Sequence, residues 1–259
     1  MITAYHRPKT LDEALALLKQ PNTLPFGGGT LLSHTSTSLN ADGTADSVHA
    51  VDLQLLGLDS LRVNGNSLEL GATLTLQSLL ESEHCLEALK RALKLEAPLN
   101  IRNSATVAGT LVSCDGRSTF ATMLLALDAK LSVSSEQSSV VSDQSSVISL
   151  GEFLPLRPRG LITSITIPLN VKLAFEYVSR TPADKPIVCV ALAQWNSGRT
   201  RLAVGGFGKS PMLAMDGTAS DDVATAARNA FHEATDEYGS AEYRMDVAST
   251  LAKRCLEVQ

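Results

Sequence analysis

Three consecutive glycines and the threonine that follows them, residues 27–30, form the part of this sequence best suited to binding an anion. Glycine adopts left-handed dihedral angles easily and leaves its N–H uncovered, so a run of glycines can surround an anion with main-chain donors. Taken alone, such a run also fits a tight turn between a strand and a helix, with no ligand. A second segment rich in small and hydroxyl residues, 101–110, favours the first interpretation, because two such loops can grip one pyrophosphate from two sides.

Other residue types that carry chemistry are dispersed, and their spacing indicates no catalytic or metal site. The five histidines show no H-x-x-x-H spacing, and no serine lies in a G-x-S-x-G elbow, which disfavours a zinc enzyme and a serine hydrolase. The four cysteines lack C-x-x-C spacing, so we interpret them as reduced cytosolic thiols and not as a disulfide framework or an iron–sulfur or zinc site. They are Cys85, Cys114, Cys189 and Cys255.

Two residues beside the second segment carry alternative interpretations. Cys114 suggests a reactive thiol, but Arg117 is the cation close to it in sequence and Asp115 opposes that charge, so we interpret the thiol as a bystander. Arg102 either faces a phosphate or caps a helix, and the sequence leaves both roles open.

Length and charge exclude several classes of protein. The chain has 259 residues, enough for one or two domains, and a formal net charge of −5, which argues against nucleic acid or an anionic membrane as a partner. The N-terminal residues lack the apolar core of a signal peptide, and no apolar run approaches the length of a membrane span. We therefore expect a cytoplasmic protein without a membrane span.

The first 55 residues predict a β-α-β-like unit. Residues 10–13 form a capping box, and apolar residues at helical spacing follow until Pro21 and Asn22 end the helix. A short strand then leads into the glycine run, and residues 47–53 are typical of another strand. The glycine spacing does not match the G-x-G-x-x-G of a Rossmann site.

The middle of the chain alternates between strand and helix patterns. Strands at 61–63 and 68–72 flank Asn64-Gly65-Asn66, a strong hairpin signal. Helices are predicted after Thr75 and over 84–97 and 119–127. The serine-rich stretch 131–149 fits either a disordered linker or two polar strands, and its β-branched residues favour strands. Residues 161–168 predict a strand that ends at a proline.

Beyond a boundary near 169–172, the pattern predicts a second, smaller unit of α+β type. Strands are expected over 172–180, 187–195 and 200–206, with a turn at 196–198. Two helices, over about 221–235 and 241–258, complete it.

The order of these segments resembles that of the FAD-binding (medium) subunit of molybdenum hydroxylases, the xanthine dehydrogenase and carbon monoxide dehydrogenase class. The glycine run is similar to the A-G-G-T-D-L loop of that family. Segment 101–110, I-R-N-S-A-T-V-A-G-T, resembles its I-R-N-x-A-T-x-G-G-N loop. Further similar segments, which extend the resemblance over essentially the whole chain, are 124–129, 175–180, 204–206 and 239–244.

The resemblance implies an α+β fold with a two-lobed FAD-binding domain of the vanillyl-alcohol-oxidase (PCMH) type over residues 1–170. Its lobes would span about 1–55 and 56–170. A C-terminal domain like that of the CO dehydrogenase flavoprotein, with a three-stranded antiparallel sheet and helices, would span 171–259.

The resemblance also implies an electron-transfer function with FAD as cofactor. Such subunits take electrons from [2Fe–2S] clusters and pass them through the flavin to NAD, a quinone or oxygen. The expected partners are an iron–sulfur subunit and a molybdopterin-binding large subunit, in a hetero-oligomer. Substrate would react on the large subunit, so no catalytic residue and no metal ligand is expected in this chain.

Carried over residue by residue, the resemblance implies a set of FAD-binding residues from both loops and from nearby positions. The glycine loop contributes Pro25, Phe26, Gly27, Gly28, Gly29, Thr30, Leu31 and Leu32. The second loop contributes the opposing wall, which consists of Thr106, Ala108, Gly109 and Thr110. Ser113, Thr119 and Ile162 are expected to lie near the cofactor further along the chain.

Several positions depart from the family pattern. The family has an acidic or amide residue at Leu31, a glycine at Ala108, an asparagine at Thr110 and an aspartate at Thr119. A basic residue is frequent at Glu176, and the loop between Phe153 and Leu161 is short. An alternative function is therefore a non-catalytic scaffold subunit of the same fold that has lost tight FAD binding; a free-standing flavin oxidase or reductase is a third interpretation.

Overall fold

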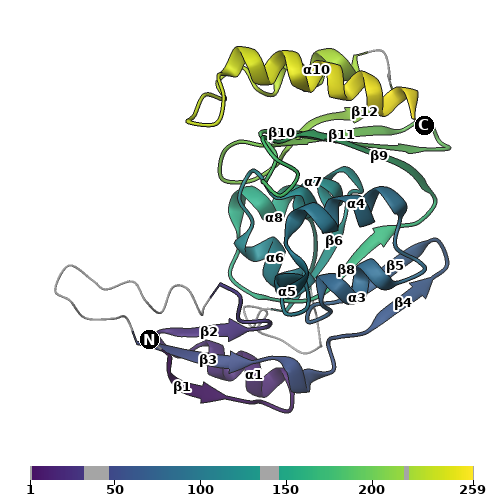
Figure 1. Ribbon diagram of the computed structural model, residues 1–259. Helices are drawn as coiled ribbons and strands as arrows, with labels where there is room; N and C mark the ends of the chain where they lie inside the picture. The colour runs from purple at the N-terminus through teal and green to yellow at the C-terminus, as the bar shows by residue number, and fades with distance from the viewer. Residues whose placement is uncertain (1, 32–46, 135–145, 219–221, 259) are drawn as a thin grey trace.

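The computed structural model describes residues 2–31, 47–134, 146–218 and 222–258. Its N-terminal part contains a three-stranded parallel sheet in the order β1 (Ile2–His6), β3 (Val48–Asp52), β2 (Thr23–Phe26). The sheet packs against helix α1 (Leu11–Leu18), and the short helix η1 (Gln54–Leu56) follows it (Figure 1). Thr10 caps α1 as predicted, but the Glu13 carboxylate accepts from the N–H of Lys9. Strand β1 was not predicted from the sequence.

The middle of the chain is built on a five-stranded antiparallel sheet. Its order is β4 (Leu61–Asn64), β5 (Ser67–Gly71), β8 (Leu161–Pro168), β6 (Lys130–Ser134), β7 (Ser146–Ser149). The predicted hairpin is present, with Gly65 in the left-handed region. The predicted polar strands correspond to β6 and β7, and residues 135–145 between them lie outside the described residues.

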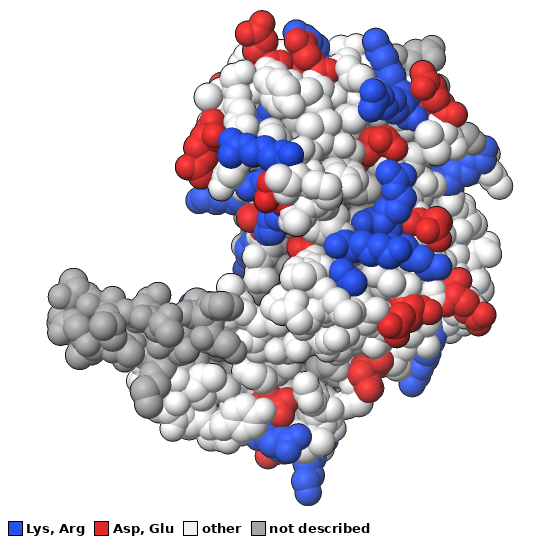
Figure 2. Space-filling model, viewed as in Figure 1, with Lys and Arg blue, Asp and Glu red and all other residues white. Residues whose placement is uncertain are grey.

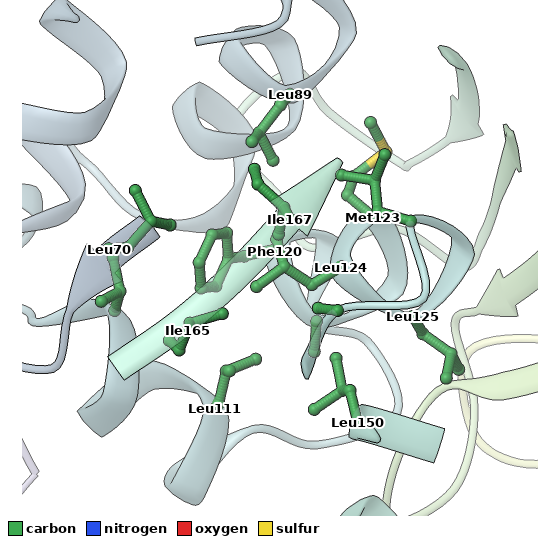
Figure 3. Packing of buried hydrophobic residues seen from close by; sticks show 14 of the residues in the cluster. Leu70, Leu89, Leu111, Phe120, Met123, Leu124, Leu125, Leu150, Ile165 and Ile167 are labelled. Carbon is green, nitrogen blue, oxygen red and sulfur yellow. The ribbon is translucent and has the colours of Figure 1, made fainter. Parts of the chain in front are cut away.

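Helices pack on this sheet and enclose the largest hydrophobic core. They are α3 (Leu76–Glu81), α4 (Glu87–Glu96), α5 (Leu99–Arg102), α6 (Val107–Ser113), α7 (Thr119–Ala126) and α8 (Leu150–Leu156). Every residue of α7 is buried. Figure 3 shows Phe120, Met123 and Leu124 of this helix among leucines and isoleucines from the surrounding strands and helices. Thus α7 lies within the largest core, and the elements around it are positioned by packing on it.

The C-terminal unit is a four-stranded antiparallel sheet in the order β12 (Met212–Gly217), β11 (Thr200–Gly205), β10 (Val188–Trp195), β9 (Val171–Val178). Helices α9 (Val223–Asn229) and α10 (Ala241–Glu257) cover one face, and α7 contacts strands from the other (Figure 1). The three predicted strands are present. The fourth, β12, was missed because its sequence, MLAMDG, lacks β-branched residues and it lies exposed at the sheet edge.

Lysines and arginines lie beside aspartates and glutamates over much of the face seen in Figure 2. Among the residues described, no helix has both the length and the apolar character needed to cross a membrane.

Candidate functional site

The two segments singled out from the sequence meet main chain to main chain. Residues 27–30 follow β2 at the carboxyl edge of the parallel sheet, an edge where α/β proteins commonly bind ligands. A Cβ added at Gly28 would overlap the carbonyl oxygen of Ser104, and one added at Gly27 would lie 2.9 Å from the Thr106 hydroxyl oxygen. The first two glycines are therefore required by the close approach of the second segment.

The second segment is not a single loop. Ile101 and Arg102 end the short helix α5, and α6 begins at Val107 with Thr106 as its N-cap, whose hydroxyl accepts from the N–H of Gly109 at 3.1 Å. Residues 101–110 were expected to be a loop because they are rich in small and hydroxyl residues, and serine, threonine and glycine have low helix propensity. Tertiary packing overrides that preference.

Main-chain hydrogen bonds attach the second segment to the stretch after β5. The N–H groups of Val107 and Ala108 donate to the carbonyls of Leu74 and Ala72 at 2.9 and 3.2 Å, respectively, and that of Leu76 donates to Ala105 at 2.9 Å. This pairing places Ala72 and Thr73 beside the two predicted segments.

These segments enclose a cavity of about 260 Å³. The sequence-predicted residues that line it are Pro25, Gly27, Gly28, Gly29, Thr30, Leu31, Thr106, Ala108, Gly109, Ser113 and Ile162. Sequence reasoning missed the other lining residues, which are Leu24, Leu53, Ala72, Thr73, Val112, Gly160 and Leu161. Nothing in the sequence indicated that Leu24, Leu161, Gly160 and Val112 line the cavity, apart from their position close to predicted residues. Ala72 and Thr73 reach the cavity through the main-chain pairing just described, which the sequence does not reveal.

Four sequence-predicted residues are not among those that line the cavity. Thr119 is buried between α7 and α4, where its hydroxyl hydrogen-bonds to the carbonyl of Ala92 at 2.8 Å and the carboxylate of Glu96 at 3.1 Å. The Thr110 hydroxyl donates to the Thr106 carbonyl. The Phe26 ring lies against Gly29. Leu32 lies outside the described residues.

The cavity wall suits a ligand with both phosphates and rings. No hydrogen bond joins the N–H of Gly27, Gly28 or Thr30 to another described residue, so these donors remain for a ligand. The hydroxyl residues Thr30, Thr106 and Ser113 add polar groups to the cavity lining. Apolar surface comes from Leu24, Leu31, Leu53, Leu161 and Ile162. The Thr73 hydroxyl is buried and has no hydrogen-bond partner among the described residues. Ligand pockets span roughly 300 to 1,000 Å³, so this cavity encloses part of a dinucleotide-sized group.

None of the described residues that line the cavity carries a charged side chain. Phosphates there would be bound by main-chain dipoles and hydroxyls, as in other glycine-rich anion sites. In the described parts of the chain, no group of three or more histidine, cysteine, aspartate or glutamate side chains gathers to hold a metal ion.

The structure resolves the roles of the two ambiguous residues. Arg102 donates from Nε to Gln77 at 2.9 Å and from Nη1 to the carbonyl of Ala97 at 2.6 Å, so it caps the end of α4. Burial raises the pKa of the Cys114 thiol, against the opposing effect of the Arg157 guanidinium 3.5 Å from its sulfur. A raised pKa keeps this thiol protonated and unreactive near neutral pH.

Comparison with known proteins identifies relatives of this chain. The family model described as "FAD binding domain in molybdopterin dehydrogenase" matches residues 1–170. The carbon monoxide dehydrogenase medium chain of Afipia carboxidovorans is 25% identical, over 98% of this chain and 95% of its own length. The glyceraldehyde dehydrogenase medium chain of Sulfolobus acidocaldarius is also 25% identical, over 98% of this chain and 97% of its own.

Solved structures share the fold. A chain of the reconstituted CO dehydrogenase from Oligotropha carboxidovorans superposes with a TM-score of 0.80 at 24% identity, covering 98% of this chain and 96% of that chain. A chain of quinoline 2-oxidoreductase from Pseudomonas putida 86 gives a TM-score of 0.79 at 19% identity, covering 98% and 95%. The α+β fold expected from the sequence is therefore confirmed.

Proposed function

This chain belongs to the family of FAD binding domains in molybdopterin dehydrogenases, and on that premise we propose that it is an electron-transfer subunit. It is a flavoprotein subunit of the medium-chain type, like the dehydrogenase medium chains that match nearly its full length. In the proposal, it takes electrons from the [2Fe–2S] clusters of a partner subunit and delivers them to NAD, a quinone or oxygen. A molybdopterin-binding large subunit carries out the substrate chemistry.

The observation that carries the proposal is the contact between the two glycine-containing segments around one cavity, whose described lining residues are all uncharged. The N–H groups of Gly27, Gly28 and Thr30 would bind the pyrophosphate, with the Thr106 hydroxyl on the opposing wall. Leu161 and Ile162 of β8 would contact a ring system. When bound, FAD supplies the redox chemistry, and the protein's part is to bind and orient it.

The departures from the family pattern affect side chains more than the main chain. Thr110 and Thr119 lie away from the cavity wall, and the Glu176 carboxylate pairs with Arg91 of α4 at 3.6 Å. Leu31 and Ala108 do line the cavity. The proposed site therefore relies on main-chain donors, and it loses one polar side chain at Leu31.

We further propose two domains, 1–170 and 171–259, with the first divided into lobes at about residue 55. Support comes from the chain path, since β8 of the five-stranded sheet ends at Pro168 and β9 of the four-stranded sheet begins at Val171. A reducing compartment such as the cytoplasm is part of the proposal, because the four cysteines are free and buried.

The absorbance spectrum of the purified full chain, with and without added FAD, tests the proposal. We expect about one FAD per chain after removal of free FAD, with no turnover with NADH by the chain alone. A reduced [2Fe–2S] protein, supplied as electron donor, should reduce the bound flavin. Protein that stays colourless after incubation with excess FAD would contradict the proposal and support the scaffold alternative, for which Leu31 in the cavity wall is the motivating observation. Turnover with NADH by the chain alone would support a free-standing flavoenzyme.

A further inference from the structure

Phe26 was expected to contact the cofactor, but the structure places it behind the glycine segment. We propose that Phe26 is a positioning residue, supported by Tyr5 and Asp52, that holds the first loop in the shape the cofactor requires. This inference rests on the proposed FAD function and extends it to three residues that do not line the cavity.

The contact between Phe26 and Gly29 is the first step. Gly29 has φ +68°, a left-handed conformation that side chains other than glycine seldom adopt. A Cβ at this position would lie 2.7 Å from Cε2 of the Phe26 ring, so the ring occupies the space beside the Gly29 Cα. The main chain at Gly29 therefore packs against the Phe26 ring, and residues 27–31 line the cavity.

The Phe26 ring is itself supported by a residue from β1, the strand at the other edge of the parallel sheet. Tyr5 at the end of β1 packs edge-on against Phe26, with ring centroids 5.8 Å apart and planes at 73°. The Tyr5 hydroxyl donates to Oδ2 of Asp52 at 2.8 Å, and Arg7 donates to the same oxygen at 3.0 Å. Edge-to-face aromatic pairs of this kind are attractive beyond the area they bury.

Asp52 fixes this arrangement to the sheet. It is 3% exposed, and its second oxygen accepts from the N–H of Gln54 at 3.0 Å. Next to it, the N–H of Leu53 donates to the carbonyl of Phe26 at 3.0 Å, which joins the ends of β2 and β3. The carboxylate is therefore committed to Tyr5 and Arg7 and is not available to bind a ribose hydroxyl.

A loop held in its binding conformation loses less conformational entropy when a ligand arrives. If Phe26 has this role, removing its ring weakens FAD binding without removing any group from the cavity. The effect of Tyr5 acts through Phe26 and is smaller.

FAD titrations of the full chain, followed by flavin fluorescence, test the inference. Phe26→Leu is expected to raise the Kd for FAD about tenfold and Tyr5→Phe about threefold, through loss of preorganisation. Phe207→Leu and Tyr243→Phe are matched controls in the C-terminal unit, since Tyr5 and Tyr243 are 52% and 43% exposed and Phe26 and Phe207 are both half-buried. The controls should leave the Kd unchanged. Unchanged Kd values in the Phe26 and Tyr5 variants would overturn the inference.

A double-mutant cycle separates this role from a general loss of stability. Gly29→Ala should raise the Kd for FAD in both backgrounds. The factor of increase should be at least about threefold smaller in the Phe26→Ala background than in the native one, because the clash with the ring is gone. Gly27→Ala, whose Cβ faces Thr106, should have the same effect in both backgrounds. Equal effects of Gly29→Ala in both backgrounds would overturn this inference and leave the proposed FAD function intact. Native protein that fails to bind FAD would overturn the proposed function together with it.

Discussion

At the scale of single residues, Leu31 lies on the cavity wall with 55% of its surface exposed, directly after the glycines and Thr30. A leucine there presents apolar surface to water and to any phosphate-bearing ligand, whereas an amide would supply hydrogen bonds. Its exposure also means that the fold does not depend on its burial.

We therefore predict that Leu31→Asn strengthens FAD binding. One added hydrogen bond contributes about 1 kcal/mol, which corresponds to about a fivefold lower Kd. Equilibrium titration with FAD measures the change, and Leu156→Asn, at a leucine that is 76% exposed and does not line the cavity, is the control. Weaker binding by the Leu31 variant would show that this position contacts an apolar part of the ligand.

Residue identity predicted the main-chain part of the candidate site better than its side-chain part. Gly28 lies where two backbones meet, and a Cβ there would overlap the carbonyl oxygen of Ser104. By contrast, Thr119 is equally compatible with a cavity wall and a buried helix start, and the choice depends on Glu96, a residue 23 positions earlier. Such long-range partners leave no local signal.

At the scale of elements, the start of α7 depends on one carboxylate from α4. Oε2 of Glu96 accepts from the hydroxyls of Ser118 and Thr119 at 3.0 and 3.1 Å and from the N–H of Phe120 at 2.9 Å. A negative charge at a helix N-terminus also interacts favourably with the helix dipole. Because all of α7 is buried, its orientation affects every layer that packs on it.

Glu96→Gln is predicted to lower the free energy of unfolding by about 1 to 3 kcal/mol, since buried donors lose a charged acceptor. Urea denaturation followed by circular dichroism measures this loss. Glu87→Gln on the same helix is the control, because the Glu87 side chain is 80% exposed. A difference of less than about 0.5 kcal/mol between the two variants, the usual size for surface substitutions, would contradict the prediction.

Elements with strong periodicity or turn chemistry were predicted well, and those formed by tertiary packing were not. The Asn64–Ser67 hairpin and helices α4, α7 and α10 follow from local patterns. Helix α8 and strand β12 were missed, because α8 contains Pro155 and β12 is an exposed edge strand. Short helix α6 forms from a sequence with weak helix propensity because its main chain pairs with residues 72–74.

At the scale of the whole molecule, an ion-pair network joins the C-terminal sheet to the end of α7. Arg199 pairs with Asp128 at 3.1 Å and with Asp216 at 2.8 Å, and the buried Arg201 contacts Asp216 and the carbonyl of Leu125. The Arg199 hydrogen bond lowers the pKa of Asp216, aided by Arg201, while burial opposes the shift.

Asp216→Asn is predicted to destabilise the protein by about 2 kcal/mol at neutral pH, because the buried Arg201 loses the nearer of its two described charged partners and keeps Asp128 at 3.6 Å. A carboxylate with a lowered pKa contributes stability above its ordinary value of 3.8, and loses it as the pH falls through the lower value in the folded state. Urea unfolding should therefore show a difference from the native protein that shrinks below about pH 4. Asp246→Asn, in an exposed pair with Arg228, serves as the control. A stability difference between Asp216→Asn and the native protein that stays the same at every pH would contradict the lowered pKa of Asp216.

The central claim is that residues 27–30 and 104–109 together bind FAD, and a titration of the full chain and two matched glycine variants tests it most directly. The native chain and Gly217→Ala, whose added Cβ meets open space, should bind FAD with equal affinity at about one per chain. Gly28→Ala should bind at least about tenfold more weakly, because its Cβ forces the two segments apart. Native protein without saturable FAD binding, or a Gly28→Ala variant that binds as tightly as the native chain, would contradict the account.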